Sequence, residues 1–475
     1  MFGFVNISPY LCQQNIEKMA HITENIRQYV WILLALCTST LQSETLTIGQ
    51  RTSQTIEDEI KAEPERSAGI IYSLPTGERH TDTPAPDGKK PFYISHFGCS
   101  ASYYLESQKQ YTNPIATLAK ADSLNMLTPL GQDVLHRLKL ICEDAKQRVG
   151  ELTIAGTKLI QELAQDMVDR FPDMFVKDSY IDARSIVRNH NIMTMQEATT
   201  QISRHCPTMD VRIKSSHSND AWMMVRDMEL EADRFNTETE TCYEAFIKAN
   251  RDNQRLMESL FVSADYVKTN IDANELSDQL FMVACTIQNT PLKGIVTLYD
   301  IFTPQEIFQH WRINNAKYYI SYGAFEQNGG NQPFSQRAPL RNLLHQGDSI
   351  KKLDFPVVHL RFSSRGMVMA LICLMELDNF GLKTSDLYEL EKQGWADYRI
   401  APFGSSVQVI YYRKDKNDDD ILIKVLLNGQ ESRLPVKTDC APYYNWQEVK
   451  RYYLRKLYAH EKLRFNKKNM NEESN

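Results

Sequence analysis

The sequence predicts an α/β protein, because three separate segments each change from a strand pattern to a helix pattern. Residues 91–105 (PFYISHFGCSASYYL) begin with aromatic and β-branched residues that fit a half-buried strand, and the run is broken at Gly98. Residues 180–195 also have a strand pattern followed by a turn and a helix pattern. Residues 355–375 have the pattern of a buried strand followed by a strongly apolar helix. Ligands of α/β proteins bind beyond the carboxyl ends of strands, so these turns are the first candidates for a site.

The length and composition are those of a large globular protein. The 475 residues suffice for one large α/β unit and a second domain, and the hydrophobic content of 42% and charged content of 24% are ordinary. The formal net charge of −6 does not indicate a general surface for nucleic acid or anionic membranes, so neither is an expected partner. A local basic pocket is still compatible with this charge.

The amino-terminal region carries a targeting pattern. Residues 30–37 (VWILLALC) are a short apolar run between Arg27 and the polar residues 38–43. This is typical of a secretory signal peptide and is too short for a stable membrane span. We therefore expect a leader and signal peptide over residues 1–43, and a mature protein that is secreted or periplasmic. The alternative is a buried amino-terminal helix.

The cysteines do not form a metal-binding pattern. Seven of the nine cysteines follow the predicted signal peptide, and they are widely spaced without a CxxC pair. The sequence therefore predicts no metal and no cofactor. Buried free thiols are expected, with one disulfide as an open alternative.

Helical spacing dominates the region after the first segment. Thr128 before Pro129 is a good helix start, and LTIAG (residues 152–156) begins a further helix that Pro172 ends. Apolar residues at helical spacing predict helices over residues 52–63, 113–126 and 128–149.

The second half of the chain changes pattern twice. Amphipathic helices rich in Glu, Asp and Arg are expected from about residue 214 to 336. The end of the chain is first strand-rich and then helical, with a turn at Asn428-Gly429. Strands are expected over residues 407–412 and 421–427, and a helix is expected to begin within residues 441–453.

Several of these segments together resemble the histidine acid phosphatases, most of all the bacterial multiple inositol polyphosphate phosphatases. The first segment is similar to a family strand that reads roughly "FYISHYGRHGSRYL". Further matches are LTIAG with the FPxxF at residues 171–175, the Ala-Arg-Ser at 183–185, the Leu-Arg-Phe at 360–362 and the Ala-Pro-Tyr-Tyr at 441–444. The resemblance covers nearly the whole mature chain.

The resemblance implies the histidine phosphatase fold, in which a mixed sheet is flanked by helices and a mainly helical cap domain is inserted. In this sequence the α/β core would comprise residues 44–213 and 337–475, and the cap would comprise residues 214–336.

The family's first catalytic motif, Arg-His-Gly-x-Arg, is changed at each chemical position. Cys99 stands in place of the first Arg, Ser100 in place of the nucleophilic His and Tyr103 in place of the second Arg. A Ser hydroxyl needs an adjacent base to attack phosphorus, and His96, four residues earlier, is not placed against it by the spacing alone. Cys99 is expected to be a buried thiol.

The other catalytic positions are changed as well. An inner phosphate-binding Arg of the family falls on His190, with Arg188 two residues earlier. The family's His-Asp pair, which supplies a phosphate contact and the general acid, falls on Ser364 and Arg365. The resemblance therefore implies that no intact catalytic residue remains. Loss of even one hydrogen-bond donor that stabilises the charge of the transition state costs about 10²–10³ in rate.

Three hypotheses follow for the function. The leading one is a secreted, catalytically impaired pseudo-phosphatase that binds a phosphorylated or anionic small molecule, or another protein, in the old cleft. Arg184, Arg188 and Arg365 facing that cleft would favour anion binding, although Arg184 is also expected to pair with a carboxylate. The alternatives are an active phosphomonoesterase on inositol polyphosphates that uses non-standard residues, and a structural or surface interaction protein, which a cleft filled by Tyr103 and Tyr104 would favour.

Overall fold

The protein is described by a computed structural model that covers residues 55–77 and 82–473. All described residues belong to one compact unit, residues 54–475. The predicted signal peptide lies outside the described residues. Within the described range, no helix has the length and apolar character needed to cross a membrane.

A mixed sheet forms the centre of the fold, as the sequence predicts. Its strands follow the order β10-β8-β7-β1-β5-β2-β3, with β9 paired to β8. The pairs β1–β5, β5–β2 and β2–β3 are parallel, and β7 and β8 continue the sheet antiparallel. The strands are β1 (Lys90–Cys99), β2 (Tyr180–Ser185), β3 (Asp210–Ser215), β5 (Val357–Ser363), β7 (Ser406–Arg413), β8 (Leu422–Leu427), β9 (Gln430–Ser432) and β10 (Tyr444–Asn445), and a separate small sheet pairs β4 (Ala324–Phe325) with β6 (Lys383–Thr384).

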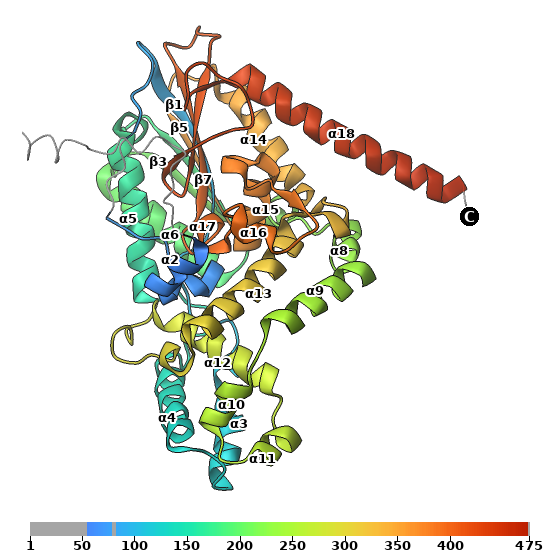
Figure 1. Ribbon diagram of the computed structural model, residues 1–475. Coiled ribbons are helices and arrows are strands. Elements are labelled where there is room, and N and C mark those ends of the chain that lie inside the picture. Colours follow the sequence, from blue (N-terminus) through green and yellow to red (C-terminus); the bar gives the residue numbers. More distant parts are fainter. Residues whose placement is uncertain (1–54, 78–81, 474–475) are drawn as a thin grey trace, which may run out of the picture. The chain divides into compact units, whose positions relative to one another are not determined.

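Helices cover both faces of this sheet (Figure 1). One face packs against α5 and α6, and the other against α14 and α15. The helices are α2 (Ile56–Ala62), α3 (Lys109–Ser123), α4 (Pro129–Asp144), α5 (Ile154–Arg170), α6 (Asn189–His205), α7 (His217–Met223), α8 (Met228–Arg234), α9 (Thr237–Asn250), α10 (Gln254–Leu260), α11 (Ala264–Asn270), α12 (Ala273–Ile287), α13 (Pro304–Tyr322), α14 (Arg337–Ile350), α15 (Arg365–Met375), α16 (Glu389–Lys392), α17 (Asp397–Ile400) and α18 (Trp446–Glu473).

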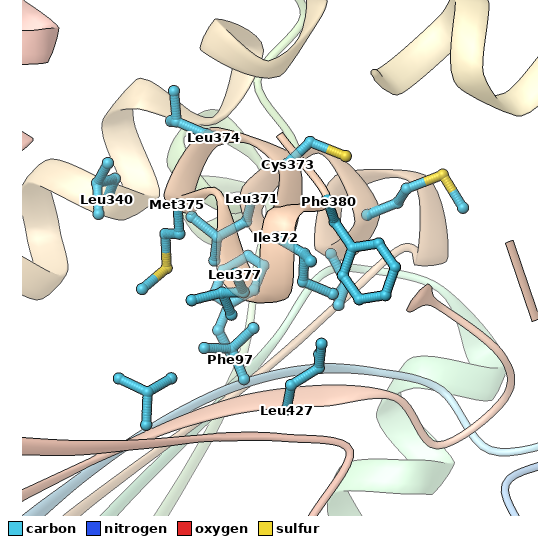
Figure 2. Close-up of a cluster of buried hydrophobic side chains, with 14 of the residues drawn as sticks. Phe97, Leu340, Leu371, Ile372, Cys373, Leu374, Met375, Leu377, Phe380 and Leu427 are labelled. Atoms are coloured by element: carbon cyan, nitrogen blue, oxygen red, sulfur yellow. The ribbon is translucent and has the colours of Figure 1, made fainter. Parts of the chain in front are cut away.

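The α15 helix is the most apolar element of the core. Figure 2 shows its side chains, among them Leu371 and Ile372, above Phe97 of β1 and Leu427 of β8. Residues 368–375 are all buried, which explains why this helix lacks the polar face of a surface helix.

A second core lies between helices and does not involve the sheet. Here α3 and α4 pack against α10 and α12, although about 110 residues separate the two pairs along the chain. The predicted cap, residues 214–336, thus shares its core with helices that precede it in sequence. Its boundaries remain a prediction.

The expected local signals act as the sequence suggests. Thr128 accepts a hydrogen bond from the Gly131 amide at the start of α4, as an N-cap does. Asn428 and Gly429 both have positive φ angles, of 54° and 80°, in the turn between β8 and β9. All seven described cysteines are free, so the alternative of a disulfide is not realised among them.

Candidate functional site

The three segments singled out from the sequence end at the same edge of the sheet. Cys99, the last residue of β1, pairs with Ser363, the last residue of β5. On the other side of β5, Ser185 at the end of β2 pairs with Phe362. The residues that follow these strands therefore meet at the carboxyl ends of parallel strands.

The α6 helix joins the loops after β1 and β5. The Thr194 hydroxyl accepts a hydrogen bond of 3.1 Å from the Ala101 amide and donates one of 2.6 Å to the His190 carbonyl. The Asn191 side-chain amide donates a 2.7 Å hydrogen bond to the Ser363 carbonyl. Both loops are thus fixed against the same helix.

The LTIAG segment fixes the loop after β1 from the other side. The Thr153 hydroxyl accepts from the Gly156 amide at 2.9 Å and caps α5. The Thr153 amide donates to the Ser102 carbonyl at 3.0 Å, and the hydroxyls of these two residues are 3.0 Å apart. A Cβ at position 156 would lie 2.1 Å from the Ser102 carbonyl oxygen, so only glycine permits this close approach.

Aromatic rings fill the place between these loops. Tyr103 stacks on His190 with ring centroids 3.9 Å apart and an interplanar angle of 7°. Phe403 meets the same tyrosine edge to face at 5.2 Å. Arg365, the first residue of α15, donates a 2.8 Å hydrogen bond to the Tyr103 hydroxyl. Four side chains from distant parts of the sequence therefore pack together in one cluster.

Arg365 is held without a carboxylate among the described residues. Its second terminal nitrogen donates to the Ile70 carbonyl at 2.9 Å, and its Cζ atom lies 4.3 Å from the centroid of the Phe403 ring. Carbonyl, phenol and aromatic faces are weaker partners for a guanidinium than a carboxylate. This arginine occupies the position at which the resemblance expects the general acid.

His190 is buried and uncharged at neutral pH. Burial, together with the charges of Arg365 and Arg188, lowers the pKa of His190 to about 3. Glu106 lies 3.6 Å from its Nδ1 atom, but this exposed carboxylate does not offset the other effects. The ring therefore serves as a neutral stacking surface and not as a cation that matches phosphate.

Neither Cys99, the last residue of β1, nor Ser100, which follows it, is an activated nucleophile. Cys99 is buried, its sulfur donates to the Pro402 carbonyl at 3.3 Å, and burial raises the pKa of its thiol to about 11. The Ser100 carbonyl accepts from the Gly404 amide at 3.0 Å. Within the described residues no hydrogen bond joins the Ser100 hydroxyl to a histidine.

His96 does not act as a base for Ser100 in this geometry. Its ring packs on Phe362 with centroids 5.3 Å apart, and its Nδ1 atom has no hydrogen-bond partner among the described groups. Burial lowers the pKa of His96 to about 4. Gly98 lies over the same ring, since a Cβ there would be 2.7 Å from the Cε1 atom of His96.

The remaining candidate residues have separate partners. Arg184 on β2 pairs with Asp182 at 3.0 Å, and Asp182 also receives Arg361 at 2.7 Å, as expected of structural arginines. Arg188 is half-exposed and its guanidinium lies 3.4 Å from Glu106. Ser364 precedes α15 as its N-cap residue without a side-chain capping bond.

Tyr103 and Tyr104 point to different parts of the molecule. Tyr103 lies in the stack, whereas Tyr104 belongs to the helical core, where its hydroxyl donates to Asp144 at 3.1 Å and accepts from Arg148 at 2.9 Å. Only the first of the two tyrosines fills the site.

The sequence did not indicate that Phe403, Ile70 and Thr194 belong to the site. Phe403 lies in a loop 300 residues after Tyr103, and Ile70 lies in a 3-10 helix (Pro64–Ile71) about 30 residues before it; no strand or motif marks either residue. Only Thr194 had a usable signal, because it lies one helical turn after His190 at the start of a predicted helix.

Comparison with known proteins supports the fold. No protein-family model and no curated protein matches the chain. Among solved structures, the multiple inositol polyphosphate phosphatase of Bifidobacterium longum in complex with inositol hexasulfate is similar over 81% of this chain and 97% of its own, with 12% identity and a TM-score of 0.65. The phytase of D. castellii is similar over 82% and 84%, with 16% identity and a TM-score of 0.59.

These similarities extend over most of both chains. The class of fold is therefore that of the inositol polyphosphate phosphatases and phytases, which belong to the histidine acid phosphatases. The fold predicted from the sequence motifs is confirmed. At 12–16% identity the similarity concerns the fold alone.

Proposed function

We propose that this chain is a pseudo-phosphatase: a protein with the phosphatase fold and without ordinary phosphatase turnover. The observation that carries the proposal is the stack of Tyr103 on His190 at 3.9 Å, closed by the Arg365 hydrogen bond to Tyr103. These three residues stand where the resemblance places two phosphate-binding arginines and the general acid. They contact one another, and the one cation among them, Arg365, is engaged by the Tyr103 hydroxyl.

The chemistry of phosphoryl transfer supports the same conclusion. Transfer to a protein nucleophile needs an activated attacking atom, cations for the equatorial oxygens and an acid for the leaving oxygen. Ser100 lacks a base within hydrogen-bonding distance among the described residues, and the Cys99 thiol is kept protonated by a pKa of about 11. A permanently charged arginine at position 365 does not protonate a leaving group at neutral pH.

Anion binding in the old cleft is the finer part of the proposal. Arg365 is the candidate for it, since no described carboxylate neutralises its charge. Arg184 is engaged by Asp182, and Arg188 is half-exposed beside Glu106. A ligand would therefore have to displace the Tyr103 hydroxyl from a single guanidinium, which predicts weak binding.

A structural or interaction role is the second candidate function. It is favoured by the way Tyr103 fills the space between the loops while α5 and α6 hold these loops in place. Loops that are held rigidly in place but carry no reactive groups are suited to form a binding surface for another molecule. Secretion also belongs to the proposal, and amino-terminal sequencing of the mature protein tests it.

The decisive experiment measures phosphate release from inositol hexakisphosphate and from a generic aryl phosphate by the purified mature protein. Ser100→Ala and Tyr103→Ala are assayed beside the wild type. We expect all three proteins to match the buffer blank. Turnover by the wild type that Ser100→Ala abolishes would overturn the proposal and identify Ser100 as a nucleophile.

Binding is tested separately from turnover. If the cleft holds the anion, inositol hexakisphosphate raises the melting temperature of the wild type by mass action, and Arg365→Met removes the shift. A melting temperature unchanged at millimolar ligand would exclude anion binding in the cleft and favour the interaction role.

A further inference from the structure

The helix α18 packs against the rest of the protein through one side only. Figure 1 shows this helix leading away from the sheet. Its buried side chains recur every three or four residues, as expected of a helix that packs along one stripe. They are Trp446, Val449, Tyr453, Leu457 and His460. The side of α18 opposite this stripe is exposed to solvent.

Three cations of α18 help to hold the helix in place. They flank the buried stripe and form ion pairs with carboxylates from earlier parts of the chain. These pairs are Lys450 with Asp348, Lys456 with Glu376 at 2.7 Å, and Arg464 with Asp227 at 2.7 Å. The charges of these three cations are therefore already compensated.

Three other cations of the same helix have no such partner. Arg451, Arg455 and Lys462 are exposed, and no ion pair or side-chain hydrogen bond joins them to another described residue. Glu461 is bound to Arg341 at 2.6 Å, so it does not compensate them. Glu448 is the one unpaired carboxylate beside them among the described side chains of α18. Three positive charges thus face one negative charge.

Two exposed aromatic side chains lie among these cations. Tyr458 is 68% exposed and Phe465 is 65% exposed. At about 100° per residue, the two aromatic residues and the three cations fall within a sector of about 80°, opposite the buried stripe. Single exposed apolar residues are ordinary, but here two of them share one sector with three unpaired cations. We call these five residues (Arg451, Arg455, Tyr458, Lys462 and Phe465) the outer face of α18.

The shape and charge of the outer face limit what can cover it. It is the convex side of a helix, about 21 Å long from Arg451 to Phe465, whereas small molecules and extended peptides bind in pockets and grooves. A second copy of the chain would place cations against cations if two outer faces met. The phosphates of a nucleic-acid duplex match the cations but do not cover exposed aromatic rings. A broad anionic surface with an apolar interior matches both kinds of side chain.

We propose that the outer face of α18 binds the surface of an anionic phospholipid membrane. The helix would lie parallel to the membrane, with Arg451, Arg455 and Lys462 at the head groups and the rings of Tyr458 and Phe465 reaching toward the acyl chains. The net charge of −6 does not oppose this binding, because charges more than about 8 Å away are largely screened at physiological ionic strength. This surface goes beyond the proposed function and shares no residue with the candidate site.

The test measures co-sedimentation of the purified mature protein with vesicles. One set of vesicles contains phosphatidylcholine alone, and the other contains equal parts of phosphatidylcholine and phosphatidylserine. We expect binding to the anionic vesicles only. The triple variant Arg451→Ala, Arg455→Ala and Lys462→Ala should bind about a hundredfold more weakly, since each cation near an anionic membrane contributes about fivefold in affinity.

The aromatic residues are tested by a second variant. Tyr458→Ser combined with Phe465→Ser should weaken binding to the anionic vesicles about tenfold, because both rings lose their contact with the apolar part of the membrane. All these positions are exposed in the free protein, so the variants should keep the urea midpoint of the wild type.

Matched control variants come from other exposed helices and loops. Lys109, Lys120 and Lys139 on α3 and α4 are exposed and have no ion pair among the described residues, and Ile295 and Val262 are 76% and 59% exposed. The triple change of these lysines to Ala, and the double change Ile295→Ser with Val262→Ser, should each leave vesicle binding within about twofold.

Each outcome decides for or against the proposal. Absence of binding to the anionic vesicles, equal binding to both kinds of vesicle, or equal losses in the α18 variants and their controls would overturn it. Tighter binding to duplex DNA than to the anionic vesicles would also overturn it and would identify a nucleic-acid surface instead. Tyr103→Ala should bind vesicles as the wild type does, so a failure of the pseudo-phosphatase proposal does not affect this result.

Discussion

The two ends of the sheet differ in how their polar groups are partnered. At the carboxyl ends of β1 and β5, Tyr103, His190, Phe403 and Arg365 contact one another. At the amino ends of β2, β3 and β5, a cavity of about 870 Å³ is lined by exposed strand and loop residues that include Asp178, Asp210 and Arg212. The place where this fold class holds its ligand is internally satisfied, while the other end is open. A shared fold thus identifies where a site is expected, but the partners of each side chain decide whether it is available.

The largest expected effect concerns the ion pairs on β2, β3 and β5. Asp182→Ala leaves Arg361, which is 93% shielded from solvent on its side chain, without its carboxylate. Removing one partner of a buried ion pair typically costs about 3–5 kcal/mol, and urea unfolding measures the loss. Asp210→Ala breaks the exposed pair with Arg212 and should change the unfolding free energy by no more than about 0.5 kcal/mol. Equal effects would mean that burial does not distinguish the two pairs.

The next effect compares one histidine from each end by its pH dependence. Burial first and neighbouring arginines second lower the pKa of His190 to about 3, and burial with Arg361 lowers the pKa of His359 to about 3. The imidazole of the unfolded chain has a pKa of about 6.5. Between pH 6.5 and 3, the unfolded state therefore binds a proton that the folded state does not bind. The contribution of each histidine to the free energy of unfolding is therefore fully present above pH 6.5, and it is lost as the pH decreases toward 3.

Two variants isolate these contributions. Between pH 6 and 4 each histidine should add up to about 1.4 kcal/mol per pH unit to the slope of the unfolding free energy, and His190→Gln or His359→Gln should remove its share. Urea midpoints at pH 7, 6 and 5 measure the slopes. Asp397 acts in the opposite direction, because burial raises its pKa to about 7, but this contribution is common to all three proteins. If both variants kept the wild-type slope of unfolding free energy against pH, the two imidazole rings would be accessible to solvent in the folded protein.

A smaller effect tests the frame of the carboxyl end. Gly156→Ala places a Cβ 2.1 Å from the Ser102 carbonyl oxygen, and overpacking of this kind costs about 1–3 kcal/mol. In an unhindered helix the same change would stabilise by about 1 kcal/mol. Ala155→Gly, at the exposed neighbouring position, is the control and should cost about 1 kcal/mol. A stabilising Gly156→Ala would show that the loop after β1 does not lie against α5.

The smallest expected effect concerns the stack itself. Tyr103→Phe keeps the ring on His190 and removes only the acceptor for Arg365, so the loss should be about 1 kcal/mol. Tyr458→Phe, at an exposed position on α18, should have no effect in the same denaturant titration. A loss well above that of one hydrogen bond would mean that Arg365 depends on Tyr103 for its position.

Much of the frame was determined by the sequence itself. The strand that includes Phe92, Tyr93 and Ile94, the cap at Thr128, the LTIAG helix start and the turn at Asn428-Gly429 rest on residues that are neighbours along the chain. The strand continues through Gly98 to Cys99, although the sequence predicts a break at Gly98. Their physical causes are local: side-chain capping, β-branched and aromatic strand residues, and glycine or asparagine at positive φ. The expectation that Arg184 pairs with a carboxylate also held, because partly buried charges need partners.

Only the tertiary structure decided what the two ends of the sheet contain. Phe403 contacts Tyr103, and the Ile70 carbonyl accepts from Arg365, from segments far away in the sequence. The row of Arg361, Arg184 and Lys214 forms only once three strands are in register. Such contacts depend on which elements become neighbours, and no spacing along a single segment carries that information. The resemblance in sequence could therefore predict that the catalytic groups are replaced, whereas the packing determined that Tyr103, His190 and Arg365 contact one another.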